Sequence, residues 1–166
     1  MKNKKAFTLI EMLIVLCLCM LVASLGIMQI SFLDSSIIHA ELDKLAAVCD
    51  YLQQRAITTN TEQILTCNLQ TNSYDSQIVH EKITHSARFG FLPNAMTMGS
   101  NAHSIKKAIT FVDNLIHFYP TGIISSGTIY LIDNKKQFMY ALSNAVSKVS
   151  HLRLYRYDGA WKLLNK

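Results

Sequence analysis

The chain has 166 residues, which is enough for one domain and short for two. Its formal net charge is +5, but three lysines before residue 7 supply much of that charge, so the chain is not a polybasic protein. It is half hydrophobic, and the apolar excess lies before Asp34. The roughly 130 residues that follow can bury a core without relying on disulfides or metals.

The N-terminal segment combines a basic start with a long apolar run. No charged residue lies between Met12 and Met28. Counted to Leu33, the run is about 22 residues, or roughly 33 Å as a helix. This length predicts a single span of a bilayer core that is about 30 Å thick. The lysines before it place the N-terminus in the cytoplasm, so we expect the rest of the chain on the far side of the cytoplasmic membrane.

Two ordinary explanations of this segment are a secretory signal peptide and a signal anchor. A signal peptide has a shorter apolar region, followed by a cleavage site with small residues, and residues 31–34 offer a poor site of that kind. Neither explanation accounts for Glu11. A carboxylate in an apolar span costs about 2.5–3.5 kcal/mol at the centre and less near the interface. Glu11 is therefore a functional candidate, unless its carboxylate simply snorkels to the interface.

Residues 4–16, with the sequence KKAFTLIEMLIVL, resemble the leader and mature N-terminus of type IV pilins and type II secretion pseudopilins. The resemblance implies cleavage by a prepilin peptidase between Ala6 and Phe7, followed by N-methylation of Phe7. The chain has Ala6 where the family usually has glycine. Glu11 corresponds to the acid that the family has at the fifth residue of the mature chain, one helical turn from the new terminus. In a filament, Glu11 of one subunit can neutralise Phe7 of its neighbour and set the register.

The segment 34–60 predicts an amphipathic continuation of the helix. Its apolar residues recur at intervals of three and four, and they are Leu42, Leu45, Ala46, Cys49, Leu52 and Ala56. We expect one helix over about 7–58, with its second half packed on the following domain. The sequence at 34–36 also allows a local break or a restart.

After residue 60 the pattern favours strands, at 63–69, 77–82, 108–112, 115–119, 128–132, 138–142 and 151–157, with a loop at 92–107. Asp158 and Gly159 predict a two-residue hairpin turn. That turn would pair Arg156 with Trp161 and lay the guanidinium over the indole. The expected fold is α+β, a long N-terminal helix packed on an antiparallel β-sheet domain. Its expected divisions are a leader (1–6), a membrane part (7–33), an amphipathic part (34–60) and a β-rich domain (61–166).

A weaker resemblance concerns the later segments LQQRAI (52–57), FYPTG (118–122) and GTIYL (127–131). They look like the H-type minor pseudopilins and related minor pilins. The resemblance implies a structural or priming subunit of a type IV pilus or a type II secretion filament. Its partners would be the prepilin peptidase, other pilin or pseudopilin subunits and the inner-membrane assembly platform.

No catalytic site is expected. The six histidines form no ligand motif, and neither a phosphate loop nor a Gly-x-Ser-x-Gly elbow is present. We therefore expect no enzyme activity, no metal and no cofactor. Cys49 and Cys67 would form a disulfide in an oxidising compartment, or remain two separate thiols, because spacing does not fix the geometry. Cys17 and Cys19, in the apolar run, are interpreted as small hydrophobes.

The C-terminal hairpin interleaves basic and aromatic residues, a pattern that suits nucleic-acid backbones and stacked bases. It is similar to basic segments that contact DNA in minor pilins of DNA-uptake systems. The candidate contacts are Arg153, Tyr155, Arg156, Trp161 and Lys162. The simpler interpretation is a surface hairpin without a ligand. Two alternatives to the assembly subunit thus remain, a DNA-binding minor pilin and a signal-anchored envelope protein with no filament role.

Overall fold

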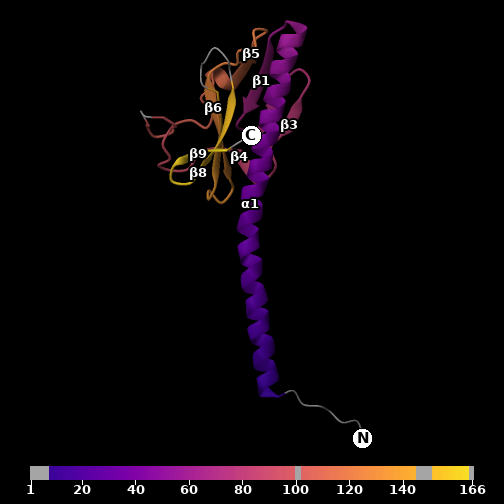
Figure 1. Cartoon of the computed structure of the whole chain (residues 1–166), viewed down its shortest axis with the longest axis vertical. Helices are drawn as coiled ribbons and strands as arrows, with labels where there is room; N and C mark the ends of the chain where they lie inside the picture. Colours follow the sequence, from indigo (N-terminus) through magenta and orange to yellow (C-terminus); the bar gives the residue numbers. More distant parts are fainter. Residues whose placement is uncertain (1–7, 100–101, 145–150, 165–166) are drawn as a thin grey trace. The chain divides into compact units, whose positions relative to one another are not determined.

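The computed structural model describes residues 8–99, 102–144 and 151–164 (Figure 1). The chain forms two compact units, Met1–Asp34 and Ser35–Lys166. One α-helix, α1 (Leu9–Thr59), contributes to both units and continues through residues 34–36. The break or restart that the sequence allowed there is absent from α1.

Unit 1 holds the first part of α1, whose large apolar side chains are exposed between residues 9 and 22. They are Leu9, Ile10, Met12, Leu13, Ile14, Val15, Leu16, Leu18, Met20, Leu21 and Val22. Among the described residues, no helix combines the length and the hydropathy that crossing a bilayer requires.

Unit 2 begins with the second part of α1, which packs on the β-sheets along the predicted apolar face. All six residues of that face are buried, and Ile38 extends it by one turn. The helix ends where Asn60 takes a left-handed φ of 51°. The hydroxyls of Thr58 and Thr59 donate hydrogen bonds to the Arg55 carbonyl in the last turn. The amphipathic helix predicted from the sequence is confirmed.

The strands form two antiparallel sheets. The first has the order β3-β2-β1-β5, and the second has the order β4-β6-β7-β8-β9. The α+β class is confirmed. The strands are β1 (Gln63–Asn68), β2 (Ser73–Asp75), β3 (His80–Lys82), β4 (Ala87–Phe89), β5 (Leu115–Phe118), β6 (Gly127–Asp133), β7 (Met139–Asn144), β8 (Leu152–Tyr157) and β9 (Trp161–Leu164).

One predicted strand, at 108–112, is wrong. The segment has a single bridge, Ile109 to Ile129, and then enters the short 3-10 turn η1 (Val112–Asn114). Asp113 and Asn114 both have positive φ angles in this turn, and two such residues cannot continue a strand. The strands β2 and β4 were not predicted, because three-residue strands carry too little periodicity to be recognised.

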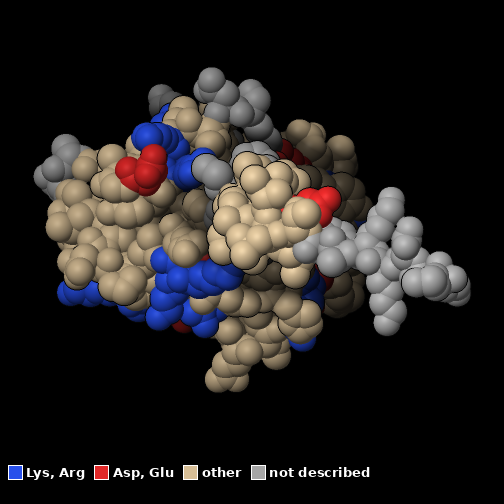
Figure 2. Space-filling view, turned by 90° about the horizontal axis from the view of Figure 1, so that it is seen from below, with Lys and Arg blue, Asp and Glu red and all other residues tan. Residues whose placement is uncertain are grey.

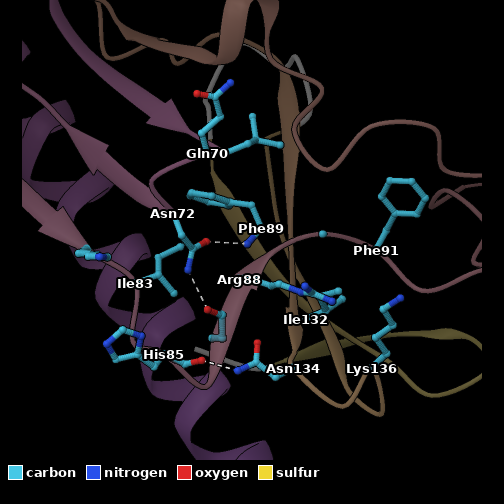
Figure 3. Close-up of a pocket in the computed structure, with 14 residues that line it drawn as sticks. Gln70, Asn72, Ile83, His85, Arg88, Phe89, Phe91, Ile132, Asn134 and Lys136 are labelled. Atoms are coloured by element: carbon cyan, nitrogen blue, oxygen red, sulfur yellow. Dashed lines mark hydrogen bonds between the residues drawn. The ribbon is translucent and has the colours of Figure 1, made fainter.

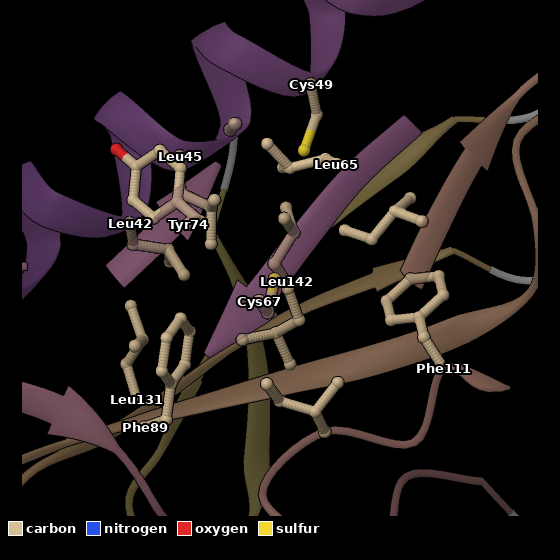
Figure 4. Close-up of a cluster of buried hydrophobic side chains, with 14 of the residues drawn as sticks. Leu42, Leu45, Cys49, Leu65, Cys67, Tyr74, Phe89, Phe111, Leu131 and Leu142 are labelled. Carbon is tan, nitrogen blue, oxygen red and sulfur yellow. The ribbon is translucent and has the colours of Figure 1, made fainter. Parts of the chain in front are cut away.

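The core lies between the second part of α1 and the two sheets, and Figure 4 shows part of it. Leu42 and Leu45 of the helix, Leu65 of β1 and Leu142 of β7 are all buried there. A second cluster lies on the opposite face of the second sheet. There Ala95 and Ile105 cover four side chains of β6 and β7, which are Tyr130, Ile132, Met139 and Ala141. The second sheet is therefore covered on both faces, which explains the almost continuous burial of β6 and β7.

Candidate functional site

The N-terminus of α1 is closed by a reciprocal pair of hydrogen bonds between Thr8 and Glu11. The Thr8 backbone N–H donates to Glu11 Oε2 at 2.8 Å, and the Glu11 N–H donates to Thr8 Oγ1 at 3.4 Å. The Thr8 hydroxyl also donates to Glu11 Oε2 at 2.9 Å. This is a capping box, in which two helix N–H groups without helical partners are satisfied by side chains.

The capping box gives Glu11 a local role that the sequence analysis missed. The signal was present as Thr-x-x-Glu just before an apolar run. Because Thr8 fixes the rotamer, the carboxylate is held at the helix N-terminus, where the macrodipole favours a negative charge. Glu11 is itself exposed, so a positively charged group can approach its carboxylate. Ala6 and Phe7, where cleavage and methylation are predicted, lie outside the described residues.

The C-terminal hairpin has a different register from the predicted one. Tyr157 pairs with Trp161 and Arg156 pairs with Lys162, so the loop has three residues, Asp158, Gly159 and Ala160. Gly159 has a φ of 71°, a left-handed value that glycine adopts without the steric cost of a side chain. The predicted pairing of Arg156 with Trp161 is wrong, because the loop has one residue more than predicted, and this shift places the two side chains on opposite faces of the sheet.

The five candidate nucleic-acid contacts are divided between the two faces of the second sheet, because side chains alternate along β8 and β9. Tyr155 and Trp161 pack on the second cluster, on the same face as Arg153, because strand side chains alternate. Arg156 lies on the other face, with its guanidinium carbon 5.8 Å from the centre of the Phe138 ring. Lys162 is on that face too, so the five residues do not form one surface.

Two of these residues have partners that occupy their functional groups. The Trp161 indole N–H donates to the Met96 carbonyl at 2.7 Å, and its ring packs against Tyr130, Tyr155 and Tyr157. Lys162 Nζ pairs with Asp158 at 2.8 Å, and this pair lowers the pKa of the Asp158 carboxyl. Trp161 therefore packs the hairpin onto the loop that contains Met96.

Cys49 and Cys67 are both buried in the core of unit 2, and both alternatives, a disulfide in an oxidising compartment and two separate thiols, stay predictions. Burial, and to a smaller extent the Asp75 carboxylate, raise the pKa of the Cys67 thiol to about 12. Both thiols behave as core residues. Within the described residues, no group of three or more His, Cys, Asp and Glu side chains is arranged to hold a metal ion.

Comparison with known proteins identifies the N-terminal segment. Residues 1–27 match a family model described as the prokaryotic N-terminal methylation motif. This range includes Ala6, Phe7 and the Thr8–Glu11 capping box, and it ends before unit 2. No curated protein and no solved structure matched the chain.

Proposed function

The chain carries the prokaryotic N-terminal methylation motif of the type IV pilin signal, and from this we propose that it is a minor pilin or pseudopilin. In this role it is a structural or priming subunit of a thin filament that grows from the cytoplasmic membrane. It acts by packing its helix among the helices of other subunits and presenting its β-rich unit outward. The observation that carries the proposal is the match over residues 1–27, with Glu11 fixed at the start of α1.

The exposed apolar surface of α1 supports this proposal. Side chains such as Leu9 and Val22 are 84% and 68% exposed, and burying each large aliphatic side chain is worth about 1.5–3 kcal/mol. Neighbouring helices of a filament, or lipid before assembly, would cover them. The proposed location is therefore a single-pass protein of the cytoplasmic membrane, with the N-terminus inside and unit 2 outside, before it enters the filament.

The Glu11 carboxylate supports a specific register between subunits. After cleavage, Phe7 would carry a positive α-amino group one helical turn before Glu11. A neighbouring subunit's terminus would satisfy the charge of Glu11 in an apolar surrounding, where an unpaired charge is costly. The partners that this function requires are the prepilin peptidase, other pilin or pseudopilin subunits and the inner-membrane assembly platform.

The proposal is tested by following the full-length chain in cells that assemble the filament. The tagged protein is located by immunoblotting of filaments sheared from the cells or enriched by overproduction, and of washed membranes. We expect it in both fractions, at a low ratio to the main subunit. Recovery from membranes alone, in cells with abundant filaments, would instead favour a signal-anchored envelope protein with no filament role.

A second candidate function is DNA contact through β8. The observation that favours it is that Arg153 is exposed and shares a face with Tyr155, beside the Trp161 ring. Arg153→Ala would then weaken DNA binding and reduce its salt dependence, whereas Arg156→Ala, on the opposite face, would not. Equal affinity of wild type and Arg153→Ala for a short duplex, at low and moderate salt, would exclude this function.

A further inference from the structure

On the face of the protein that Figure 2 shows, Lys and Arg side chains lie in several groups, with some Asp and Glu side chains beside them. In unit 2, a pocket of about 550 Å³ opens where the β1–β2 turn of the first sheet meets β4, the edge strand of the second (Figure 3). Its lining includes the cations Lys82, Arg88 and Lys136, together with His85, and no lining residue that the structure describes is Asp or Glu. Such a pocket attracts anions.

The walls of the pocket are fixed by Asn72, which links the two sheets. Its side-chain amide donates to the Ala87 carbonyl at 2.8 Å, and its carbonyl oxygen accepts the Phe89 N–H at 3.0 Å. Gly90 lets the backbone pack closely against Ile132 in the pocket wall, because a Cβ at this position would lie only 2.7 Å from Ile132 Cδ1. The pocket is thus built from ordered backbone and a buried floor.

The position of Lys136 is set by the buried side chain of Asp133. This carboxylate accepts the backbone N–H groups of Lys135, Gln137 and Phe138, at 3.1, 2.6 and 2.8 Å. These bonds hold the β6–β7 turn, in which Lys136 has a left-handed φ of 56°. Both oxygens of the Asp133 carboxylate therefore accept hydrogen bonds from the turn, and among the described residues this carboxylate forms no ion pair with Lys136.

Arg88 and Lys136 approach the pocket from one side. Arg88 pairs in register with Ile132, and Figure 3 shows the Arg88 and Lys136 side chains beside Ile132, with Gln70 farther along the pocket. Lys82, from β3, is exposed, while its neighbour Glu81 pairs with Lys44 of α1 at 2.6 Å. Among the described residues, no acidic group forms an ion pair with Lys82, Arg88 or Lys136.

We propose that this pocket binds the phosphoryl group of a small phosphate ester. Three cations without an acidic partner match the two negative charges of a phosphate monoester better than the single charge of a carboxylate. An arginine fork and lysine point charges are the usual donors to phosphate. The volume suits a sugar-sized ligand. A stacked nucleic-acid strand fits less well, because Phe89 is only 8% exposed and packs in the core.

The ester can come from two sources, a soluble phosphorylated metabolite or the headgroup of a phospholipid. Both are tested on the full-length chain in a neutral, phosphate-free detergent by isothermal titration calorimetry. The soluble probes are inorganic phosphate and glycerol 3-phosphate, and the lipid probe is phosphatidic acid, whose headgroup is a phosphate monoester, in mixed micelles. Saturable binding of glycerol 3-phosphate indicates a soluble ligand, and binding of the lipid alone indicates a headgroup; either result supports the proposal.

The variants decide whether binding occurs in this pocket. Arg88→Gln with Lys136→Gln is expected to weaken binding at least about tenfold, because the variant loses the charge-assisted hydrogen bonds of two cations to the phosphoryl group. The matched control, Arg156→Gln with Lys162→Gln, removes the same charge from β8 and β9 and is expected to leave the affinity unchanged. Thermal unfolding of both variants shows whether they fold.

Three results would overturn the proposal. The first is an equal loss of affinity in the two double variants, which would indicate general electrostatic attraction. The second is binding of a single-stranded oligonucleotide with no binding of the phosphate probes, which would indicate a nucleic-acid surface. The third is no binding of any phosphate probe at low millimolar concentration and low salt by the folded wild type. Because this site lies in unit 2, none of these results bears on filament assembly.

Discussion

Glu11 is held by the residue three positions before it: its Oε2 atom accepts hydrogen bonds from both the backbone N–H and the hydroxyl of Thr8, at 2.8 and 2.9 Å. The acid of the pilin signal is thus also the third helical residue of a capping box. Two roles follow for one carboxylate. One is to begin the helix, and the other, which we propose, is to offer a negative charge to a neighbouring subunit.

The two roles of Glu11 are separated by comparing Glu11→Gln with Glu11→Ala. Glutamine preserves the capping box but removes the charge, and alanine removes both. If the charge pairs with the terminus of a neighbour, both variants are expected to lose filament incorporation, measured as the subunit's share in the filament fraction. The helix content of Glu11→Gln, measured by circular dichroism, is expected to match wild type.

Thr8→Ser is the matched control, because serine keeps the capping hydroxyl and leaves the charge in place. It is expected to assemble like wild type. Normal incorporation of Glu11→Gln together with failure of Glu11→Ala would show that capping alone explains the acid, and the intersubunit pairing would be abandoned.

Local patterns predicted the helix well and the sheets less well. The apolar face of α1 depends on residues three and four apart, so it was readable before any tertiary contact was known. The hairpin register was not, because Asp-Gly occurs in two-residue and in three-residue loops, and the strand registers of these loops differ by one residue. The Thr8–Glu11 capping box was readable from the sequence. The basic pocket was not, since Arg88 and Lys136 meet only when β4 pairs with β6, and Lys82 comes from β3 of the other sheet.

Leu45 tests whether the second part of α1 stabilises unit 2. It is 1% exposed in the core, whereas Leu163 of β9 is 57% exposed. Leu45→Ala is expected to lower the free energy of unfolding by about 2–5 kcal/mol, and Leu163→Ala by less than about 0.5 kcal/mol. Urea unfolding of the full chain, followed by Trp161 fluorescence, measures both. Equal effects of the two substitutions would contradict the assignment of α1 to the core.

Cys67 predicts a loss of stability in alkali. Folding raises the pKa of its thiol from 9.0 to about 12, so between these values the unfolded chain has lost a proton that the folded chain keeps. Stability therefore falls as the pH rises from about 9 to about 12, by up to roughly 4 kcal/mol at 1.4 kcal/mol per unit. Burial also raises the pKa of the Tyr74 hydroxyl, in the same direction.

The contribution of Cys67 is isolated by comparing slopes. Urea midpoints measured from pH 8 to 11 are expected to fall less steeply for Cys67→Ala than for wild type, because that variant has no thiol to ionise, while Tyr74 remains in both. Cys17→Ala, which removes an exposed thiol, serves as the control and should keep the wild-type slope. Identical slopes for wild type and Cys67→Ala would show that the buried thiol does not oppose ionisation.

The central claim, that the chain is a prepilin-type subunit, is tested most directly by the intact mass of the membrane-extracted protein from cells with and without the prepilin peptidase. With the peptidase, we expect the loss of residues 1–6 and the addition of one methyl group at Phe7. Ala6→Gly, which places the family's usual residue before the cut, should be processed at least as completely. A protein that still begins at Met1 in the presence of active peptidase, in both wild type and Ala6→Gly, would contradict the account.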